Sequence, residues 1–427
     1  MRQSPVVPLV GALVLLAPAG DARADAASLY GHGARDSGLA QSDLADGRAE
    51  AAARVTPTTA ATPGTRFALG YGRAWNRLAF AGAPAGLDDV SGTDIDFQLA
   101  RALGGEVSLG GAFALHLPDR GLARITFRAA SEPQFLRYDA DAHRTASDAV
   151  VALRWRALAI ALGASLGARS GGSGVDFHLP QDARGPHADS AADVSLTTTL
   201  APIVAAAIDL GPAALALRLR GAVSLPVEIA AGTRVDLEQN PLNGTTVVKV
   251  SGTAGYDPLT VDLAARVGPF SGFRALGSLQ YARWRDAPAP IAAFDLTLAL
   301  GVRPSVLLGS FEAPKLHDTL SPRLGVELAP DDAWWAARVG FQYAPSPVPA
   351  AHGFLTPVDP ARQVITAGGS LRFGRVWGVE STLDAFAGVH LAARAREQKE
   401  NLALPWARYD TGGHVMTAGA TFAGGFR

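Results

Sequence analysis

Residues 334–375 read WWAARVGFQYAPSPVPAAHGFLTPVDPARQVITAGGSLRFGR and contain two alternating segments separated by a proline-rich stretch. In the first segment, Val339, Phe341 and Tyr343 share one parity, whereas Arg338 and Gln342 share the other. Successive side chains of a β-strand point to opposite faces, so this pattern predicts a strand with one apolar and one polar face. Each segment has about ten residues, the length that a tilted strand needs to cross the hydrocarbon core of a bilayer.

The second segment repeats the arrangement. Ile365 and Leu371 share one parity, while Thr366 and Ser370 share the other. Between the two segments, Ala344–Pro360 contains five prolines, which cannot donate to a strand ladder, so we predict a loop there. A strand in a soluble β-sandwich also alternates, so the rest of the chain must decide between a soluble sheet and a membrane barrel.

The N-terminus resembles a secretory signal peptide. Arg2 precedes an apolar run from Val6 to Ala17, and Ala22-Arg23-Ala24 resembles a cleavage site. The run is too short for the ~20 residues of a spanning helix. We therefore expect residues 1–24 to be removed on export. The chain has no cysteine, so packing and hydrogen bonds must stabilise it without disulfides.

Strand patterns recur from Phe67 to the C-terminus. In Leu215–Arg220, leucines alternate with Arg218 and Arg220. In a helix these two arginines would lie roughly 200° apart, whereas in a strand they share one face. The whole of Leu200–Leu217 is apolar enough for a membrane helix, but Asp209–Pro212 favours a turn between two strands.

The spacing of these segments predicts an up-and-down barrel. Another tight turn is predicted at Arg156-Ala157, where the apolar parity switches. Short turns alternate with long connections, as in outer-membrane barrels, which have an even number of strands. About fifteen segments show the alternating pattern of a strand, and Phe294–Leu300 shows it least clearly. A ring of ~14 strands leaves a lumen. The non-alternating segment Asp25–Gly64 precedes the first strand and could fill it. The longer predicted connections are Ala130–Thr145, Gly171–Ala192, Ile229–Thr246, Asp286–Ala293, Ala344–Pro360 and Ala392–Gly412.

Several short motifs carry a resemblance to a known family. Gly33-Ala34-Arg35, Ser37-Gly38-Leu39 and Leu44-Ala45-Asp46 begin the mature chain, and Tyr281–Trp284, Asp318–Gly325 and Gln342–Pro349 follow in the same order as in that family. The chain resembles the FadL/TodX family of outer-membrane transporters for long-chain fatty acids and hydrocarbons. The family carries Asn-Pro-Ala near the end of its N-terminal hatch, whereas this chain has Thr56, Pro57 and Thr58, which we take as the candidate gating residues.

The resemblance implies an all-β, fourteen-stranded transmembrane barrel in the bacterial outer membrane. Its divisions are a signal peptide (1–24), a hatch or plug (25–64) and the barrel (65–427). It implies facilitated diffusion of hydrophobic molecules without a cofactor or enzymatic activity. The expected partners are the substrate, outer-membrane lipid and the barrel-assembly machinery. With a net charge of −1, nothing favours nucleic acid. Two alternatives stay open: a non-transporting envelope barrel and an open general porin.

Four inward-facing arginines are candidate ligand contacts in the lumen, because a guanidinium binds a carboxylate in bidentate fashion. The alternative is that they pair with inward-facing acids in a structural network. The arginines are Arg154, Arg218, Arg220 and Arg338, and the acids are Asp262, Asp295, Glu327 and Asp384.

Three further features are interpreted conservatively. Gly163–Gly167 matches the G-x-S-x-G elbow of serine hydrolases around Ser165, but it lies in an alternating segment, where that motif does not work. The nine histidines are scattered, so the sequence predicts no metal site. Trp75, Trp284, Trp334 and Trp335 are expected in the interfacial girdles.

Overall fold

The computed structural model describes most of the chain between Leu29 and Phe426. Outside this part, the structure describes Pro18 and Ala19. The predicted signal peptide otherwise lies outside the described residues. Within the described ranges, no helix is both long and apolar enough to cross a bilayer. The described ranges are 18–19, 29–46, 52–119, 128–129, 133–138, 145–172, 194–235, 244–289, 291–300, 303–310, 312–349, 351–352, 355–376, 379–403 and 406–426.

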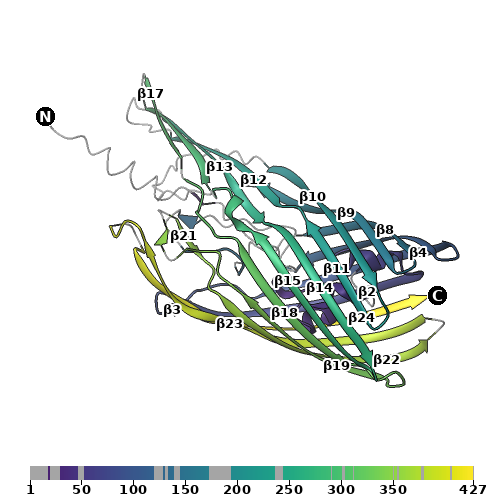
Figure 1. Cartoon of the computed structure of the whole chain (residues 1–427). Coiled ribbons are helices and arrows are strands. Elements are labelled where there is room, and N and C mark those ends of the chain that lie inside the picture. Colours follow the sequence, from purple (N-terminus) through teal and green to yellow (C-terminus); the bar gives the residue numbers. More distant parts are fainter. Residues whose placement is uncertain are drawn as a thin grey trace.

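Fourteen of the described strands form a closed antiparallel barrel (Figure 1). The ring closes because β24 pairs with both β23 and β2. The predicted barrel with ~14 strands is therefore confirmed. The wall strands are β2 (Gly64–Phe80), β4 (Val90–Gly104), β5 (Val107–Pro118), β8 (Ala146–Trp155), β9 (Leu158–Gly172), β10 (Val194–Asp209), β11 (Ala213–Arg220), β14 (Leu259–Phe270), β15 (Phe273–Arg283), β18 (Thr319–Leu328), β19 (Trp335–Ala344), β22 (Arg362–Val376), β23 (Val379–Lys399) and β24 (Arg408–Phe426).

Short and long connections alternate around the barrel. The predicted turns at Arg156-Ala157 and before Pro212 are confirmed, because β8 leads directly into β9 and β10 into β11. All the short connections lie at the end where β2 begins and β24 ends. The long connections therefore share the opposite end, as in outer-membrane barrels with short periplasmic turns.

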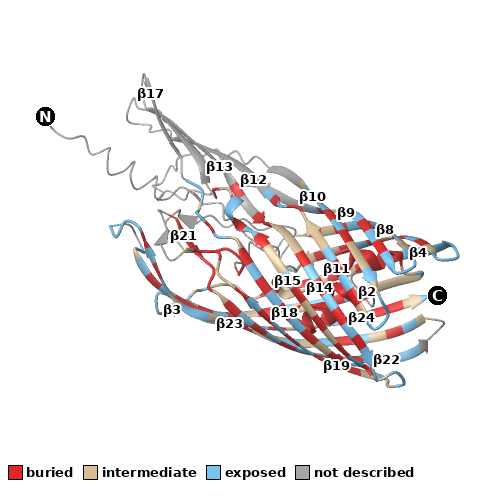
Figure 2. Cartoon of the chain, viewed as in Figure 1, coloured by how far each residue is buried: buried red, intermediate tan, exposed pale blue. Residues whose placement is uncertain are grey.

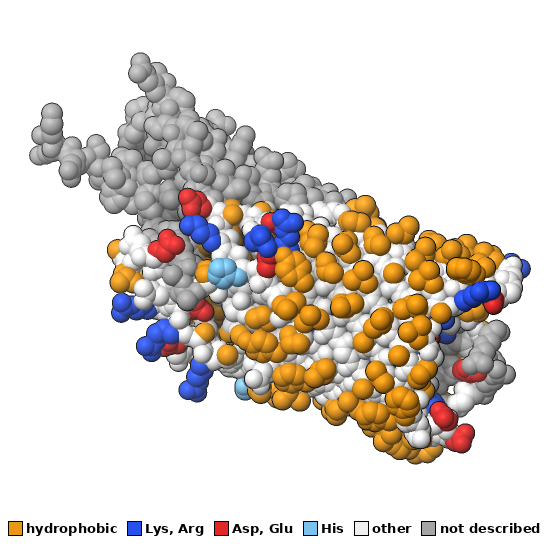
Figure 3. Space-filling model, viewed as in Figure 1, with side chains coloured by type: hydrophobic (Ala, Val, Ile, Leu, Met, Phe, Trp, Pro, Cys, Tyr) orange, Lys and Arg blue, Asp and Glu red, His pale blue; other side chains and the backbone are white. Residues whose placement is uncertain are grey.

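The two faces of the wall differ in polarity. Along β19, buried and exposed residues alternate strictly: Arg338 is 3% exposed, whereas Val339 next to it is 56% exposed. Figure 2 shows this alternation across the barrel. On the face shown in Figure 3, hydrophobic side chains cover the middle of the barrel, and charged side chains gather toward its ends. Such an apolar band matches the hydrocarbon layer of a membrane.

A second sheet continues the barrel on its long-connection side. It contains β12 (Val223–Val235), β13 (Gly244–Asp257), β16 (Ile291–Leu300) and β17 (Arg303–Ser310), paired in that order. In Figure 1, β13 and β17 project at the end opposite the C-terminus. The predicted connections at 229–246 and 286–293 were thus wrong in part, because they contain ends of these strands. The predicted connection at 392–412 was also wrong in part, because β23 extends to Lys399 and β24 begins at Arg408. Phe294–Leu300 is a strand outside the wall, which removes the odd strand from the count.

Two outer connections meet above the lumen and form a cap, defined here as residues 133–138 and 355–359. β7 (Pro133–Phe135) pairs in parallel with β21 (Thr356–Val358), and Arg137 Nε lies 2.9 Å from Asp359 Oδ2. Burial lowers the pKa of Arg137 to about 10 despite the neighbouring carboxylate. The remaining short strands are β1 (Pro18–Ala19), β3 (Ala83–Pro84), β6 (Arg128–Ala129) and β20 (Ala351–His352).

The girdle prediction was wrong for Trp284, which is only 2% exposed. It begins the 3₁₀ turn η4 (Trp284–Asp286) just beyond β15, and this turn directs its ring under the cap. There the ring packs against Tyr256, and the Arg137 guanidinium lies 4.9 Å from its centroid. Trp334, by contrast, is 66% exposed, as a girdle residue should be.

Candidate functional site

The N-terminal segment, defined as residues 29–46 and 52–63, touches strands around the ring from within. Its short helices are α3 (Ala34–Gly38), η1 (Asp43–Ala45) and η2 (Pro57–Ala61). The first contacts β19 and β22 to β24, the second β11, β14 and β15, and the third β4, β5 and β8 to β10. Every residue of these three helices is buried. The segment therefore sits against the inner face of the wall, where Figure 1 shows it in purple.

Glycines on the inner face make this close approach possible. A Cβ at Gly340 would lie 2.4 Å from the carbonyl carbon of Leu39, and one at Gly325 would lie 2.2 Å from Ser42 Oγ. A Cβ at Gly110 would lie 2.0 Å from the carbonyl oxygen of Ala60. At Gly340 and Gly110 the atoms met belong to the backbone, so these two wall positions accept only glycine while the segment is in place. At Gly325 the atom met is a serine hydroxyl, which can rotate away.

Arg35 fixes α3 to the wall through a buried charge network. Its Nη2 donates to Glu327 Oε2 at 2.9 Å and also to Asp46 of the segment. Glu327 also binds Arg274 at 3.0 Å and lies 3.5 Å from Arg338. Buried charges need such partners, because an isolated ion loses its hydration without compensation.

Asp43 lies within the same part of the segment. Burial raises the pKa of its carboxyl well above 3.8, and the nearby Asp36 adds to the shift, although Arg35 opposes it. A raised pKa means that the seated segment favours the neutral form of Asp43.

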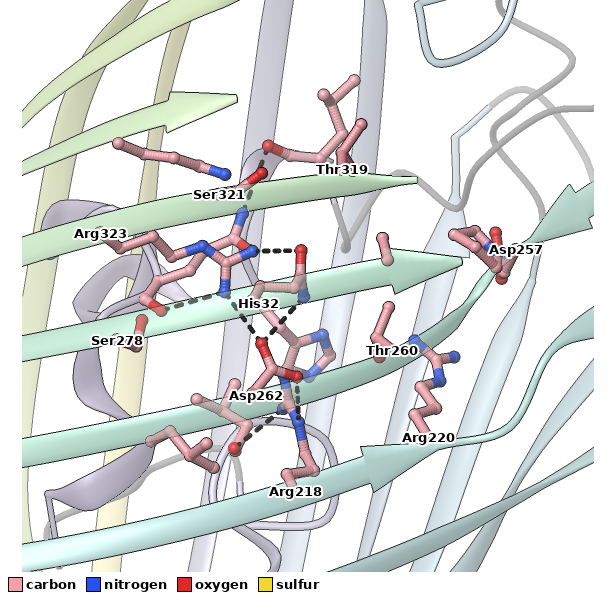
Figure 4. Close-up of a pocket in the computed structure, with 18 of the residues that line it drawn as sticks. His32, Arg218, Arg220, Asp257, Thr260, Asp262, Ser278, Thr319, Ser321 and Arg323 are labelled. Carbon is pink, nitrogen blue, oxygen red and sulfur yellow. Dashed lines mark hydrogen bonds and ion pairs between the residues drawn. The ribbon is translucent and has the colours of Figure 1, made fainter. Parts of the chain in front are cut away.

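A second network lies nearby on the wall, around Asp262 of β14, which is separated from β18 by β15 alone (Figure 4). The Asp262 carboxylate accepts hydrogen bonds from Arg218 at 3.1 Å and from Gln280 at 2.9 Å, and Arg323 reaches it at 3.4 Å. Arg218 Nη1 also donates to the carbonyl oxygens of Arg54 and Val55, at 2.6 and 3.0 Å. This arginine therefore ties the barrel wall to the backbone just before Thr56.

The candidate gating residues form the start of η2. Thr56 precedes the turn, Pro57 opens it, and Thr59 Oγ1 donates to the Thr56 carbonyl at 2.8 Å. Gln98 of β4 donates to the Thr59 carbonyl at 2.7 Å. Arg54 binds Asp148 of β8 at 2.6 Å, and burial lowers the pKa of Arg54 despite this partner. Thr56, Pro57 and Thr58 are thus buried at a point that is held by wall strands on both sides.

His32 provides a third contact with the wall. Its Nε2 lies 3.0 Å from Asp96 Oδ1, and its Nδ1 lies 3.2 Å from Asp94 Oδ1. Burial opposes the charged imidazolium, but these two carboxylates outweigh it and raise the pKa of His32 well above 6.5.

A polar cavity of about 100 Å³ lies between the segment and the cap. Among the described residues, its lining includes six arginines and three aspartates, so its walls are predominantly cationic. Arg218, Arg220 and Arg323 all border it, together with hydroxyl groups such as Thr319 and Ser321 (Figure 4). Pockets that bind drug-sized ligands are several times larger. The cavity in this closed arrangement has room for a small polar group rather than for a whole lipid or hydrocarbon chain.

The structure separates the four predicted arginines. Arg218 and Arg220 border this cavity, and Arg220 Nη2 donates to Ser165 Oγ at 2.7 Å. Arg338 instead binds Asp384 at 2.6 Å, and Arg154 borders a smaller cavity beside Asp46 and Thr58. The four do not converge on one ligand. Of the acids proposed as partners, Asp262, Glu327 and Asp384 pair with arginines, while Asp295 lies on β16, outside the wall.

Ser165 lacks the setting of a hydrolase nucleophile. It lies inside β9 in register with Asp148 of β8, not on a strand-to-helix turn. Ser165 is buried, and its hydroxyl accepts a hydrogen bond from Arg220.

Sequence reasoning missed Arg35, Arg54 and Arg323 as lumen residues. Arg35 and Arg54 lie in a segment without alternation, so no periodic signal marks them. Along β18, apolar Leu320 and Leu324 share one parity, and Ser321 and Arg323 share the other. This alternation could have identified Arg323 as inward-facing.

The sequence matches no protein-family model and no curated protein. Solved structures do resemble the fold. A FadL homologue of Pseudomonas aeruginosa aligns with a TM-score of 0.52 at 12% identity over 92% of this chain and 97% of that one. The toluene transporter TbuX of Ralstonia pickettii gives 0.53 at 13% identity over 93% and 99%. The monoaromatic hydrocarbon channel CymD gives 0.51 at 11% identity over 91% and 97%. The expected likeness to FadL-type barrels is thus confirmed at the level of the fold.

Proposed function

We propose that this chain is a gated channel of the bacterial outer membrane that passes hydrophobic small molecules, such as long-chain fatty acids or aromatic hydrocarbons, by facilitated diffusion. The N-terminal segment acts as the hatch. The observation that carries the proposal is the seating of this segment against glycines of the inner wall, in a fold shared with hydrocarbon transporters.

The dimensions of the cavity support a gate rather than an open pore. A volume of about 100 Å³ between the segment and the cap leaves no room for an alkyl chain. Substrate must therefore displace the segment, the cap or both. The buried contacts favour a discrete release of the segment, because Glu327 loses Arg35 and Arg218 loses the Arg54 and Val55 carbonyls when the segment leaves.

Uptake by cells tests the transport proposal. Cells that express the gene should accumulate labelled oleate or toluene faster than cells without it, and equal uptake would refute transport. A non-transporting envelope barrel predicts equal uptake. A general porin instead predicts faster entry of small sugars and no preference for the apolar probes.

A designed disulfide tests whether the segment must move. The chain has no cysteine, and a Cβ at Gly325 would lie 2.2 Å from Ser42 Oγ, so Ser42→Cys with Gly325→Cys places two thiols in contact. We expect the oxidised double variant to lose uptake and to regain it after reduction. The two single-cysteine variants serve as controls. Unchanged uptake by the cross-linked protein would exclude release of this part of the segment from the transport cycle.

A further inference from the structure

His32, Asp94 and His116 meet from three separate parts of the chain. His32 belongs to the N-terminal segment, while Asp94 of β4 and His116 of β5 are direct cross-strand partners on the inner face. Asp94 Oδ1 lies 3.2 Å from His32 Nδ1 and 2.6 Å from His116 Nδ1. One ligand atom from each of the three residues fits within a span of 4.8 Å.

These distances suit a tetrahedral transition-metal ion. Zinc binds imidazole nitrogen and carboxylate oxygen at about 2.0–2.2 Å, which places neighbouring ligand atoms about 3.3–3.5 Å apart. The 3.2 Å between His32 and Asp94 is about 0.1 Å short of this range, and the two histidine nitrogens lie within 4.8 Å of each other, so they must approach by at most about 1.5 Å. The pair between His116 and Asp94 needs to open by less than about 1 Å, within the reach of side-chain rotation.

The surroundings have the second layer that metal-binding histidines need. His32 Nε2 lies 3.0 and 3.1 Å from the two oxygens of Asp96, so Asp96 can accept its N–H and leave the Nδ1 lone pair facing Asp94. Asp94 Oδ2 accepts a hydrogen bond from the Gly33 backbone at 3.2 Å, which orients that carboxylate as well.

The charge of the site also calls for a cation. Asp94, Asp96 and both histidines are each less than 9% exposed. Without a metal, a proton shared between His32 and these carboxylates compensates their buried charge. A divalent ion bound at His32 Nδ1 takes the place of that proton and compensates the same carboxylates. A cavity of about 50 Å³ borders Asp94 and His116 and has room for a water molecule as fourth ligand.

We propose that His32, Asp94 and His116 bind a zinc-class divalent ion that fastens the N-terminal segment to strands β4 and β5, with Asp96 positioning His32. Metal binding stands on the geometry alone. Its effect on the gate rests on the proposed function, because release of the segment would then require the ion to lose His32.

Metal binding is measured on the full chain in detergent, stripped with chelator and titrated with zinc chloride. The wild type should bind one zinc ion per chain. His32→Ala and His116→Ala should each weaken binding at least tenfold, and Asp96→Asn about ten- to hundredfold. His317→Ala, at an exposed histidine, is the matched control and should bind like the wild type. Absence of zinc binding by the wild type, or unchanged affinity in both histidine variants, would overturn the proposal.

Two further measurements keep the test decisive. If the alanine variants do not fold, zinc X-ray absorption of the wild type must show two imidazole ligands, and fewer would refute the site. Zinc should also slow tryptic cleavage after Arg35 in the wild type but not in His116→Ala, and equal rates with and without zinc would refute the fastening role. Neither result depends on uptake, so a failure of the transport proposal stays distinguishable.

Discussion

Glu327 binds arginines from three elements and is the residue whose loss should cost most in the charge network around Arg35. It lies 2.9 Å from Arg35, 3.0 Å from Arg274 and 3.5 Å from Arg338. Removing one partner of a buried pair costs roughly 3–5 kcal/mol, since the remaining charge stays buried without compensation. We expect Glu327→Gln to lower the free energy of unfolding by about that much, measured by urea titration in detergent micelles. Exposed Glu312→Gln is the control, and a loss below about 1 kcal/mol would show that the network is not stabilising.

The raised pKa of Asp43 makes the stability of the seated segment depend on pH. Its pKa is raised above 3.8 in the folded chain by burial and by Asp36. Below pH 3.8 the carboxyl is protonated whether the segment is seated or free. As pH rises, the free segment ionises first, so the seated state loses stability until the folded pKa is passed. We expect tryptic cleavage after Arg35 to speed up with rising pH once corrected for trypsin's own profile. Asp43→Asn should flatten this dependence, and an equally steep profile in that variant would assign the effect elsewhere.

For single residues, the alternation of the sequence predicts which way a side chain points but not which residues it contacts. The inward directions of Arg218 and Arg338 follow from their neighbours in a period-two pattern. The pairing of Arg35 with Glu327 joins residues 292 positions apart, and nothing local in either segment encodes it. The same holds for His32, whose partners on β4 and β5 are set by the barrel register rather than by sequence spacing.

Among the elements, β19 and α3 show how the wall is shaped around the segment. A methyl group at position 340 would lie 2.4 and 2.5 Å from backbone atoms of Leu39 and Ala40, so the segment must shift as a unit. We expect Gly340→Ala to leave the barrel folded, because the nearest wall atom to its Cβ is the hydroxyl of the cross-strand partner Thr366, at 2.7 Å, which can rotate away. The rate of cleavage after Arg35 should rise several-fold. Gly277→Ala is the matched control, since its Cβ would make only ordinary contacts, with a Leu324 methyl group at 3.6 Å and the Arg323 carbonyl oxygen at 3.9 Å. Equal cleavage in both variants would show that the close contact at Gly340 does not hold the segment.

The sequence predicts the wall strands well because lipid and lumen impose opposite requirements on alternate residues. It predicts β12, β13 and β17 poorly. These strands pair only with one another and with β16, beyond the wall. Their sequences are therefore free of the strict alternation that a bilayer imposes on Leu215 or Val339. The short helices of the segment have three to five residues, too few for a helical period to show.

For the whole molecule, we expect the barrel wall to fold without the N-terminal segment. Every wall strand bonds to two wall neighbours, and the pairs Arg274–Glu327, Arg338–Asp384 and Arg218–Asp262 lie within the wall itself. Deleting residues 27–63 should therefore leave a closed barrel and empty its lumen. In planar bilayers we expect the deletion variant to conduct ions in large, steady steps, while the intact chain conducts little, because a fourteen-stranded ring without its filling is wide enough for water.

Heat-modifiable migration in electrophoresis confirms that the variant has folded. A conductance equal to that of the intact chain would mean that the cap, not the N-terminal segment, closes the channel, and deleting 133–138 in the same assay would then restore conduction.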